Sequence, residues 1–176
     1  ACYFITFRLA DAVPATLRAQ WLADRKAWLA HHPEPWTTAV EAEYHERFSA
    51  RMDAWLDAGH GECVLRDPAA RKSVEATLRH LDGTDYLHHG RVLMPNHAHV
   101  LVSLSDRARL EDVVGAWKSV SARKINQHLG RKGTLWQEDY FDRLVRDAGH
   151  FENAARYIRR NPVKAKLREG EFTLYE

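Results

Sequence analysis

His97 and His99 are the residues most able to carry chemistry, and they are separated by a single alanine. They lie in the segment Met94-Pro95-Asn96-His97-Ala98-His99-Val100-Leu101-Val102. The alternation of apolar residues predicts a β-strand, on which residues two apart point to the same face. Both imidazoles would then project together and could share one metal ion. Two ligands make a weak site, so a third must come from another element.

Tyr157 is the second candidate, on a predicted helix near the end of the chain. Asn161 follows it by four residues, so the phenol and the amide share one helix face. A tyrosine can act as a covalent nucleophile, and a metal-held phosphate makes its weak nucleophilicity less limiting. Taken alone, each pattern is also explained by packing: two buried or surface histidines, and a tyrosine resting on a sheet.

Basic residues are concentrated in the C-terminal third. Residues 118–168 contain 13 Lys and Arg against 5 Asp and Glu, within a chain whose formal net charge is only +2. Such a region suits a polyphosphate backbone, although a solvated helical face would have the same composition. The candidate phosphate contacts are Lys118, Arg123, Lys124, Arg156, Arg159, Arg160 and Lys164, and Trp136 and Tyr140 are candidates for stacking on unpaired bases.

The elements that must position these residues follow from periodicity and capping signals. Strands are predicted at Cys2–Leu9, at about Tyr86–Met94 and Asn96–Leu104, and at Leu144–Arg146. Helices are predicted from Pro14 to about Ala30, from Thr37 or Thr38 to about Ala58, from Asp67-Pro68 to about Leu81, at about Leu110–Leu129, and from Ala148 to about Arg160, where Asn161-Pro162 interrupts or ends the last one. In the third strand, Val100 and Val102 face one way and the two histidines face the other.

This order predicts an α+β fold in one domain, residues 1–176, with a helical insertion at about 12–60 after the first strand. A ferredoxin-like antiparallel sheet with helices on one side fits it. Cys2 and Cys63 are too few for a disulfide framework, which favours a reducing cytoplasm. The chain has no apolar run long enough for a membrane, and its first residues resemble a strand more than a signal peptide.

Three blocks of the sequence, taken in order, resemble the single-tyrosine HUH transposases of the IS200-like type, and most of all the REP-associated tyrosine transposases (RAYTs). The first block is the histidine segment quoted above, with its His-hydrophobe-His pattern. The other two are Leu135-Trp136-Gln137-Glu138-Asp139-Tyr140-Phe141-Asp142-Arg143 and Tyr157-Ile158-Arg159-Arg160-Asn161-Pro162-Val163-Lys164. The resemblance covers the first strand and then about Val64–Leu167.

The resemblance implies a single HUH-type transposase domain that cleaves and rejoins single-stranded DNA near palindromic, REP-like hairpins. It implies a 5′-phosphotyrosine intermediate at Tyr157 and a divalent metal, Mg²⁺ or Mn²⁺, held by His97 and His99, with Asn161 in the place of a polar third ligand. Tyr140 is the rival nucleophile, but it belongs to the Trp-Gln block. The expected state is a monomer or a homodimer.

Two features depart from the family pattern. Relatives usually pass from the first strand to the helix by a short connection, whereas this chain inserts roughly fifty residues, among them Trp21, Trp28, Trp36 and Trp55. Asn161 precedes Pro162, and a residue before proline is disfavoured in helical geometry.

Other functions remain open at this point. Histidine-triad hydrolases need a third histidine where this chain has Leu101, and the two-histidine phosphodiesterases need HxT or HxS twice, which is absent. A non-catalytic, transposase-derived nucleic-acid-binding module would keep the basic region without the chemistry. A scaffold domain would use the histidines to bind zinc for stability only.

Overall fold

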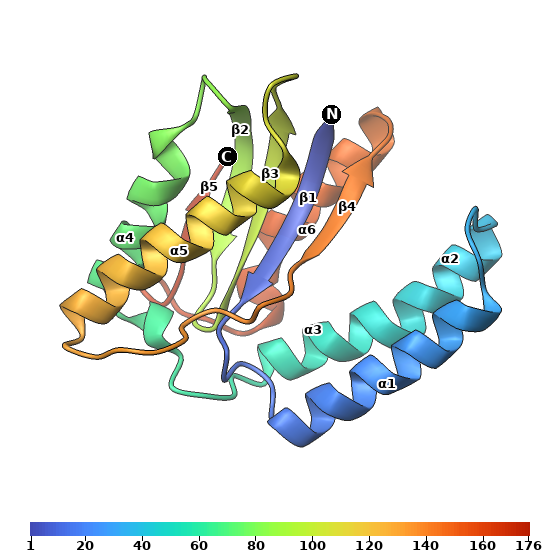
Figure 1. Ribbon diagram of the computed structural model, residues 1–176, viewed down its shortest axis with the longest axis horizontal. Coiled ribbons are helices and arrows are strands. Elements are labelled where there is room, and N and C mark those ends of the chain that lie inside the picture. The colour runs from blue at the N-terminus through green and yellow to red at the C-terminus, as the bar shows by residue number, and fades with distance from the viewer.

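The computed structural model describes residues 1–176, and its centre is a five-stranded antiparallel sheet (Figure 1). The strand order is β4-β1-β3-β2-β5, with bounds β1 Cys2–Arg8, β2 Tyr86–Leu93, β3 His97–Leu104, β4 Phe141–Val145 and β5 Thr173–Tyr175. Helix α4 (Pro68–His80) precedes the β2–β3 hairpin, and α5 (Leu110–His128) links β3 to β4. The first four strands therefore follow the ferredoxin-like β-α-β-β-α-β order. The α+β class is confirmed.

Helices α4 and α5 lie together on one face of the sheet and bury its main core (Figure 1). Side chains such as Phe7 and Val100 point to this face, and Trp117 of α5 packs on them. Trp136 also belongs to this core, with only 4% of its surface exposed. Its indole donates a hydrogen bond to Ser121 Oγ at 2.9 Å. The prediction that Trp136 stacks on DNA bases is therefore wrong, because core side chains surround its ring and leave no face for a base.

Helix α6 (Ala148–Lys164) covers the opposite face, so the predicted arrangement of helices on one side holds for α4 and α5 only. Ile158 of α6 packs there with Val92, Met94 and Leu101 in a second, smaller cluster. Successive side chains of a strand point to opposite faces of the sheet, and β3 carries apolar side chains on both faces. Leu101 faces the same way as the two histidines, and an apolar side chain on that face must also be covered by a packed element.

The end of α6 differs from the sequence prediction, because the helix continues past Asn161-Pro162 to Lys164. The Ala165 amide donates to the Asn161 carbonyl at 3.0 Å, and the Leu167 amide donates to the Pro162 carbonyl at 2.9 Å. Proline removes one backbone donor, and in the last turn of a helix the neighbouring bonds compensate for that loss. Asn161 therefore remains one helical turn beyond Tyr157, on the same face.

The insertion forms a helical hairpin beside the sheet (Figure 1). Helix α1 (Ala15–His31) is the first arm of the hairpin. The second arm is one continuous helix made of α2 (Thr38–Tyr44), a π-helical turn (His45–Ser49) and α3 (Ala50–Asp57). The predicted Thr37 cap is confirmed, since its hydroxyl accepts from the Val40 amide at 3.3 Å. Trp21 and Trp28 of α1 pack on Phe48, and the Trp21 indole donates to the Phe48 carbonyl at 3.1 Å. The tryptophans of the insertion therefore brace the hairpin.

Both ends of the insertion meet at a narrow neck beside β1. The Glu62 amide donates to Asp11 Oδ2 at 2.9 Å. Gly61 has φ +84°, and a Cβ at this position would lie 2.5 Å from the Asp11 carboxyl carbon. Only glycine fits this conformation and this approach. A short 3₁₀ turn (Val64–Arg66) then leads into α4, which begins at the predicted Asp67 cap.

The two short strands β4 and β5 form the edges of the sheet. The short strand predicted at Leu144–Arg146 is found at Phe141–Val145, paired with β1. Strand β5 was not predicted; its three residues pair with β2. None of the helices combines the length and the hydropathy needed to cross a membrane.

Candidate active site

His97 and His99 project from β3 toward α6, and each has only 1% of its surface exposed. Their Nε2 atoms lie 3.1 Å apart, and the two rings are inclined by 80°. The prediction that the pair shares one face of the strand is confirmed. The two side chains meet at their outer nitrogens rather than lying parallel, so they converge on one point.

Each histidine is oriented through its other ring nitrogen. His97 Nδ1 lies 2.8 Å from Asn96 Oδ1, and the Asn96 amide nitrogen donates to the Leu56 carbonyl at 3.2 Å. Because an amide oxygen only accepts, His97 Nδ1 must carry the proton, which leaves the Nε2 lone pair free. His99 Nδ1 lies 2.7 Å from Thr6 Oγ1, a hydroxyl that can either donate or accept. His99 can therefore present either a proton or a lone pair at Nε2.

Both imidazoles are held in their neutral form. Burial, with the charges of Arg8 and Lys164, lowers the pKa of His97 to about 3. Burial also holds the pKa of His99 well below its ordinary value, with further contributions from His97, Lys164 and Arg8. A neutral imidazole is the form that binds a metal ion.

The spacing of the two nitrogens fits a shared metal ion. Two ligand nitrogens that are each about 2.1 Å from one ion, at tetrahedral or octahedral angles, lie roughly 3.0–3.4 Å apart. The observed separation of 3.1 Å falls in this range. No three His, Cys, Asp or Glu side chains lie together as a metal-binding group. Asn161, the third ligand expected from the sequence, is 3% exposed, and its Oδ1 is buried without a hydrogen-bond partner.

Tyr157 stands edge-on to His99, with ring centroids 5.1 Å apart and an interplanar angle of 83°. Phe4 of β1 contacts both rings. The Tyr157 hydroxyl donates to Asp53 Oδ2 of α3 at 2.8 Å. Burial raises the pKa of Tyr157, and the charge and hydrogen bond of Asp53 raise it further, while Asn161 opposes the shift. The phenol is therefore held in its protonated form, directly beside the histidine pair.

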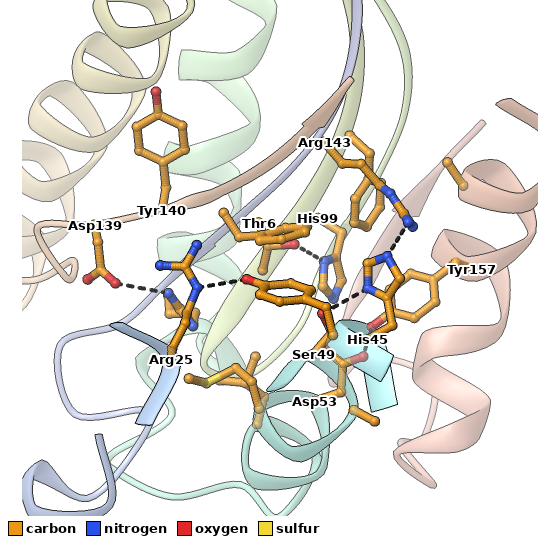
Figure 2. Close-up of a pocket in the computed structure, with 18 of the residues that line it drawn as sticks. Thr6, Arg25, His45, Ser49, Asp53, His99, Asp139, Tyr140, Arg143 and Tyr157 are labelled. Atoms are coloured by element: carbon orange, nitrogen blue, oxygen red, sulfur yellow. Dashed lines mark hydrogen bonds and ion pairs between the residues drawn. The ribbon is translucent and has the colours of Figure 1, made fainter. Parts of the chain in front are cut away.

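A cavity of about 590 Å³ opens between the insertion and the sheet, beside Tyr157 (Figure 2). Its wall on the core side includes Thr6, His99 and Tyr157, and its wall on the insertion side includes Tyr44 and Asp53. The volume is typical of small-molecule or nucleotide sites. His99 and Tyr157 therefore face a partly open cavity that the insertion helps to form.

Arg8 brings a buried positive charge to this cavity. It pairs across from His97 in the β1–β3 register, so its side chain lies on the histidine face of the sheet. Only 4% of its surface is exposed. One amino group contacts Asp139 at 3.3 Å, and Arg18 of α1 binds the same carboxylate at 2.6 Å. Arg8 Nε has no partner, so the guanidinium keeps a free donor for a ligand.

Some predicted DNA contacts lie near this cavity. Tyr140 lines it, and Figure 2 shows its hydroxyl directed away from His99 and Tyr157, which favours Tyr157 as the nucleophile. Lys118 lies 6.0 Å from the Tyr140 ring centroid and donates to the Glu138 carbonyl at 2.5 Å. Lys118 therefore lies beside Tyr140 but does not itself line the cavity.

The remaining predicted contacts are dispersed. Arg156, Arg159 and Arg160 are exposed on α6, the helix that carries Tyr157. Lys164 pairs with Asp57 of the insertion at 3.3 Å. Arg123 and Lys124 are exposed on α5, which covers the opposite face of the sheet. The basic residues thus form two separate regions.

Four residues of the site were missed by the sequence analysis. Asn96 directly precedes His97, and a polar residue in that position was a usable signal. Thr6 and Arg8 reach the site through strand pairing, and Asp53 reaches it through the docking of α3 on α6. Their sequence separation from the histidines or the tyrosine leaves no local pattern that would reveal them.

Part of the chain matches a known protein family. Residues 85–161, which include both histidines, Tyr157 and Asn161, match the family model described as "Transposase IS200 like". This segment therefore matches the IS200-like transposase family, and the resemblance drawn from the sequence is confirmed over these residues. Arg8 and Asp53 lie outside the matched segment.

Two solved structures are similar to this chain. One is a REP-associated tyrosine transposase bound to a REP hairpin, at 15% identity and a TM-score of 0.48, covering 93% of this chain and 67% of that one. The other is a protein from Deinococcus radiodurans R1 assigned as a transposase, at 15% identity and a TM-score of 0.35, covering 92% of this chain and 90% of that one. No curated protein matches the chain.

Proposed function

We propose that the chain is a metal-dependent, site-specific endonuclease and transposase that cleaves and rejoins single-stranded DNA near palindromic, REP-like hairpins. The observation that carries this proposal is the contact of Tyr157 with the buried His97–His99 pair, within the segment that matches the IS200-like family. An isolated histidine pair or an isolated tyrosine would not support it.

The residues of the site have distinct roles in this mechanism. His97, His99 and Asn161 would hold Mg²⁺ or Mn²⁺, which would polarise the scissile phosphate when bound. Asn96 and Thr6 hold the imidazoles in the orientation that binding requires, as outer hydrogen-bond partners of metal ligands commonly do. The free donor of Arg8 is placed to bind a phosphate oxygen in the cavity.

Tyr157 would carry out the strand cleavage. Its hydroxyl oxygen attacks phosphorus, and the 3′-oxygen leaves, which yields a 5′-phosphotyrosine and a free 3′-OH. The bond energy of the phosphodiester is retained in the phosphotyrosine link, so a 3′-OH can attack it and rejoin the strands. A cavity of about 590 Å³ has room for only a nucleotide or two, which favours an extended single strand over a duplex.

The direct test is Tyr157→Phe. We expect this substitution to abolish nicking of a hairpin-flanked single strand, because it removes the attacking oxygen and leaves the ring packing on His99 and Phe4 intact. On a denaturing gel, the wild type with Mn²⁺ and labelled oligonucleotide should give a protein–DNA adduct that the variant lacks. Tyr140→Phe is the matched control and should retain the adduct. Full nicking activity in the Tyr157 variant would refute the assignment of the nucleophile.

The alternative is a non-catalytic, transposase-derived nucleic-acid-binding module. One observation favours it: the Tyr157 hydroxyl is already engaged with Asp53 rather than facing the cavity freely. Salt-sensitive hairpin binding by the wild type, with no adduct under any divalent ion, would support this reading over the enzymatic one.

A further inference from the structure

Asp53 contributes a carboxylate from the insertion to the hydroxyl of Tyr157. The distance between Tyr157 Oη and Asp53 Oδ2 is 2.8 Å, and 104 residues separate the two in the sequence. Asp53 also lines the cavity that Tyr157 and His99 face. It lies outside residues 85–161, so the family match says nothing about it.

Holding α3 against α6 does not require this contact. Asp57, one helical turn further along α3, already pairs with Lys164 of α6 at 3.3 Å. That pair joins opposite charges at a partly exposed position, with side-chain exposures of 17% and 54%. Asp53, by contrast, has no ion-pair partner within contact distance, and its one hydrogen bond is to the phenol. A partly buried carboxylate without a counter-ion costs stability, which points to a chemical role.

We propose that Asp53 is a catalytic residue that accepts the phenolic proton of Tyr157 as its oxygen attacks the scissile phosphate. The inference rests on the proposed function and adds the proton acceptor that the attack needs. A free tyrosine has a pKa near about 10 and is protonated at neutral pH, so its proton must leave as the bond to phosphorus forms.

The step is balanced as follows. The Tyr157 Oη–phosphorus bond forms, the phosphorus–O3′ bond breaks, and the phenolic proton moves to Asp53 Oδ2. The departing 3′-oxygen takes a proton from water. In the rejoining reaction a 3′-OH attacks the phosphotyrosine and releases its proton to water, and Asp53 returns its proton to the departing Tyr157 oxygen. The same carboxyl is thus the base in cleavage and the acid in rejoining.

The first experiment compares Asp53→Asn with Asp57→Asn, two changes that remove one charge from the same helix. We expect Asp53→Asn to slow adduct formation by roughly 100-fold or more, the usual contribution of general acid–base catalysis. Asp57→Asn should change the rate by less than about threefold, because it removes only a partly exposed ion pair. Hairpin binding and thermal unfolding, measured in parallel, should be similar in the two variants.

The second experiment separates proton transfer from positioning. Replacing Tyr157 with 3,5-difluorotyrosine makes the phenol more acidic and reduces its need for a base. We expect this replacement to restore most of the lost rate in the Asp53→Asn background and to have little effect in the wild type. A loss of rate without this recovery would show that Asp53 only shapes the site, and the proposal would fail.

Chemical rescue provides an independent measurement in case the amide disturbs folding. We expect added formate, a small carboxylate, to accelerate adduct formation by Asp53→Ala and not by the wild type. Wild-type or faster nicking by the Asp53 variants would overturn the proposal, and faster nicking would identify Asp53 as a restraint on the tyrosine. These outcomes require that the wild type forms the adduct; if it does not, the proposed function itself is refuted.

Discussion

The buried polar groups around Trp117, on the α5 face of the sheet, differ from those around the histidine pair, on the α6 face. Under α5, the Trp117 indole donates to the Tyr86 hydroxyl at 3.0 Å, and that hydroxyl donates to the Leu78 carbonyl at 2.5 Å. On the α6 face, Asn161 Oδ1 and Arg8 Nε are buried without partners. A buried polar atom without a partner costs about 1–3 kcal/mol. The hydrogen-bonded cluster around Trp117 therefore stabilises the fold, while the unpartnered atoms near the histidines cost stability and stay available to a ligand.

Trp117→Ala should have the largest effect, and it tests the first face. The side chain is 1% exposed and packs on Phe7 and Tyr86, so its removal leaves a cavity and takes away the donor to the Tyr86 hydroxyl. We expect the free energy of unfolding to fall by about 3–5 kcal/mol in urea titration. A loss below about 1 kcal/mol would mean that this face does not carry the fold.

Asn161→Leu tests the second face and should act in the opposite direction. Leucine has a similar shape and removes the unpartnered acceptor, so we expect the free energy of unfolding to rise by about 1 kcal/mol without divalent ions. In the wild type, Mn²⁺ should raise the melting temperature, because an ion that binds only the native state stabilises it. The variant should lose most of this shift, and EDTA should abolish it in the wild type. Equal Mn²⁺ stabilisation in both proteins would exclude Asn161 as a ligand.

Tyr86 gives the smallest effect, a change in the pH dependence of stability. Burial raises the pKa of its hydroxyl to about 12. Between the unfolded value of about 10 and this value, the native state binds more protons than the unfolded state, so stability should decrease as the pH rises from about 10 to about 12. Denaturant titrations of the wild type and Tyr86→Phe across this range should show a steeper decline for the wild type. Parallel curves would show that the hydroxyl is not held as described.

The parts of the site that were predictable from sequence are those that follow from the spacing of residues within one strand or one helix. Alternation along β3 separated the histidines from Val100 and Val102, and the four-residue spacing placed Asn161 with Tyr157. These predictions hold because side-chain direction within one strand or helix depends only on backbone geometry. The position of α6 on the histidine face was implied by the same alternation, although helices were expected on the other face alone.

The remaining parts depend on which elements pack together. Strand β5 has three residues, too few for a period, and forms because the edge of β2 offers unpaired backbone groups. Asp53 lies on a helix whose pattern shows only its packing against the tryptophans of α1. Its contact with Tyr157 depends on how the whole insertion packs against α6, and no pattern in the sequence near Asp53 indicates that packing.

The neck of the insertion has a consequence for how such a protein can change over time. The strand that enters the insertion and the segment that leaves it are joined by Asp11, Gly61 and the Glu62 amide, so the ends of the hairpin coincide. A coding segment bounded at this point can be acquired, lost or exchanged in a single genetic event without shifting the pairing of β1. Because Asp53 lies within the insertion, gain or loss of that coding segment would also determine whether this carboxylate is present to accept the proton of Tyr157.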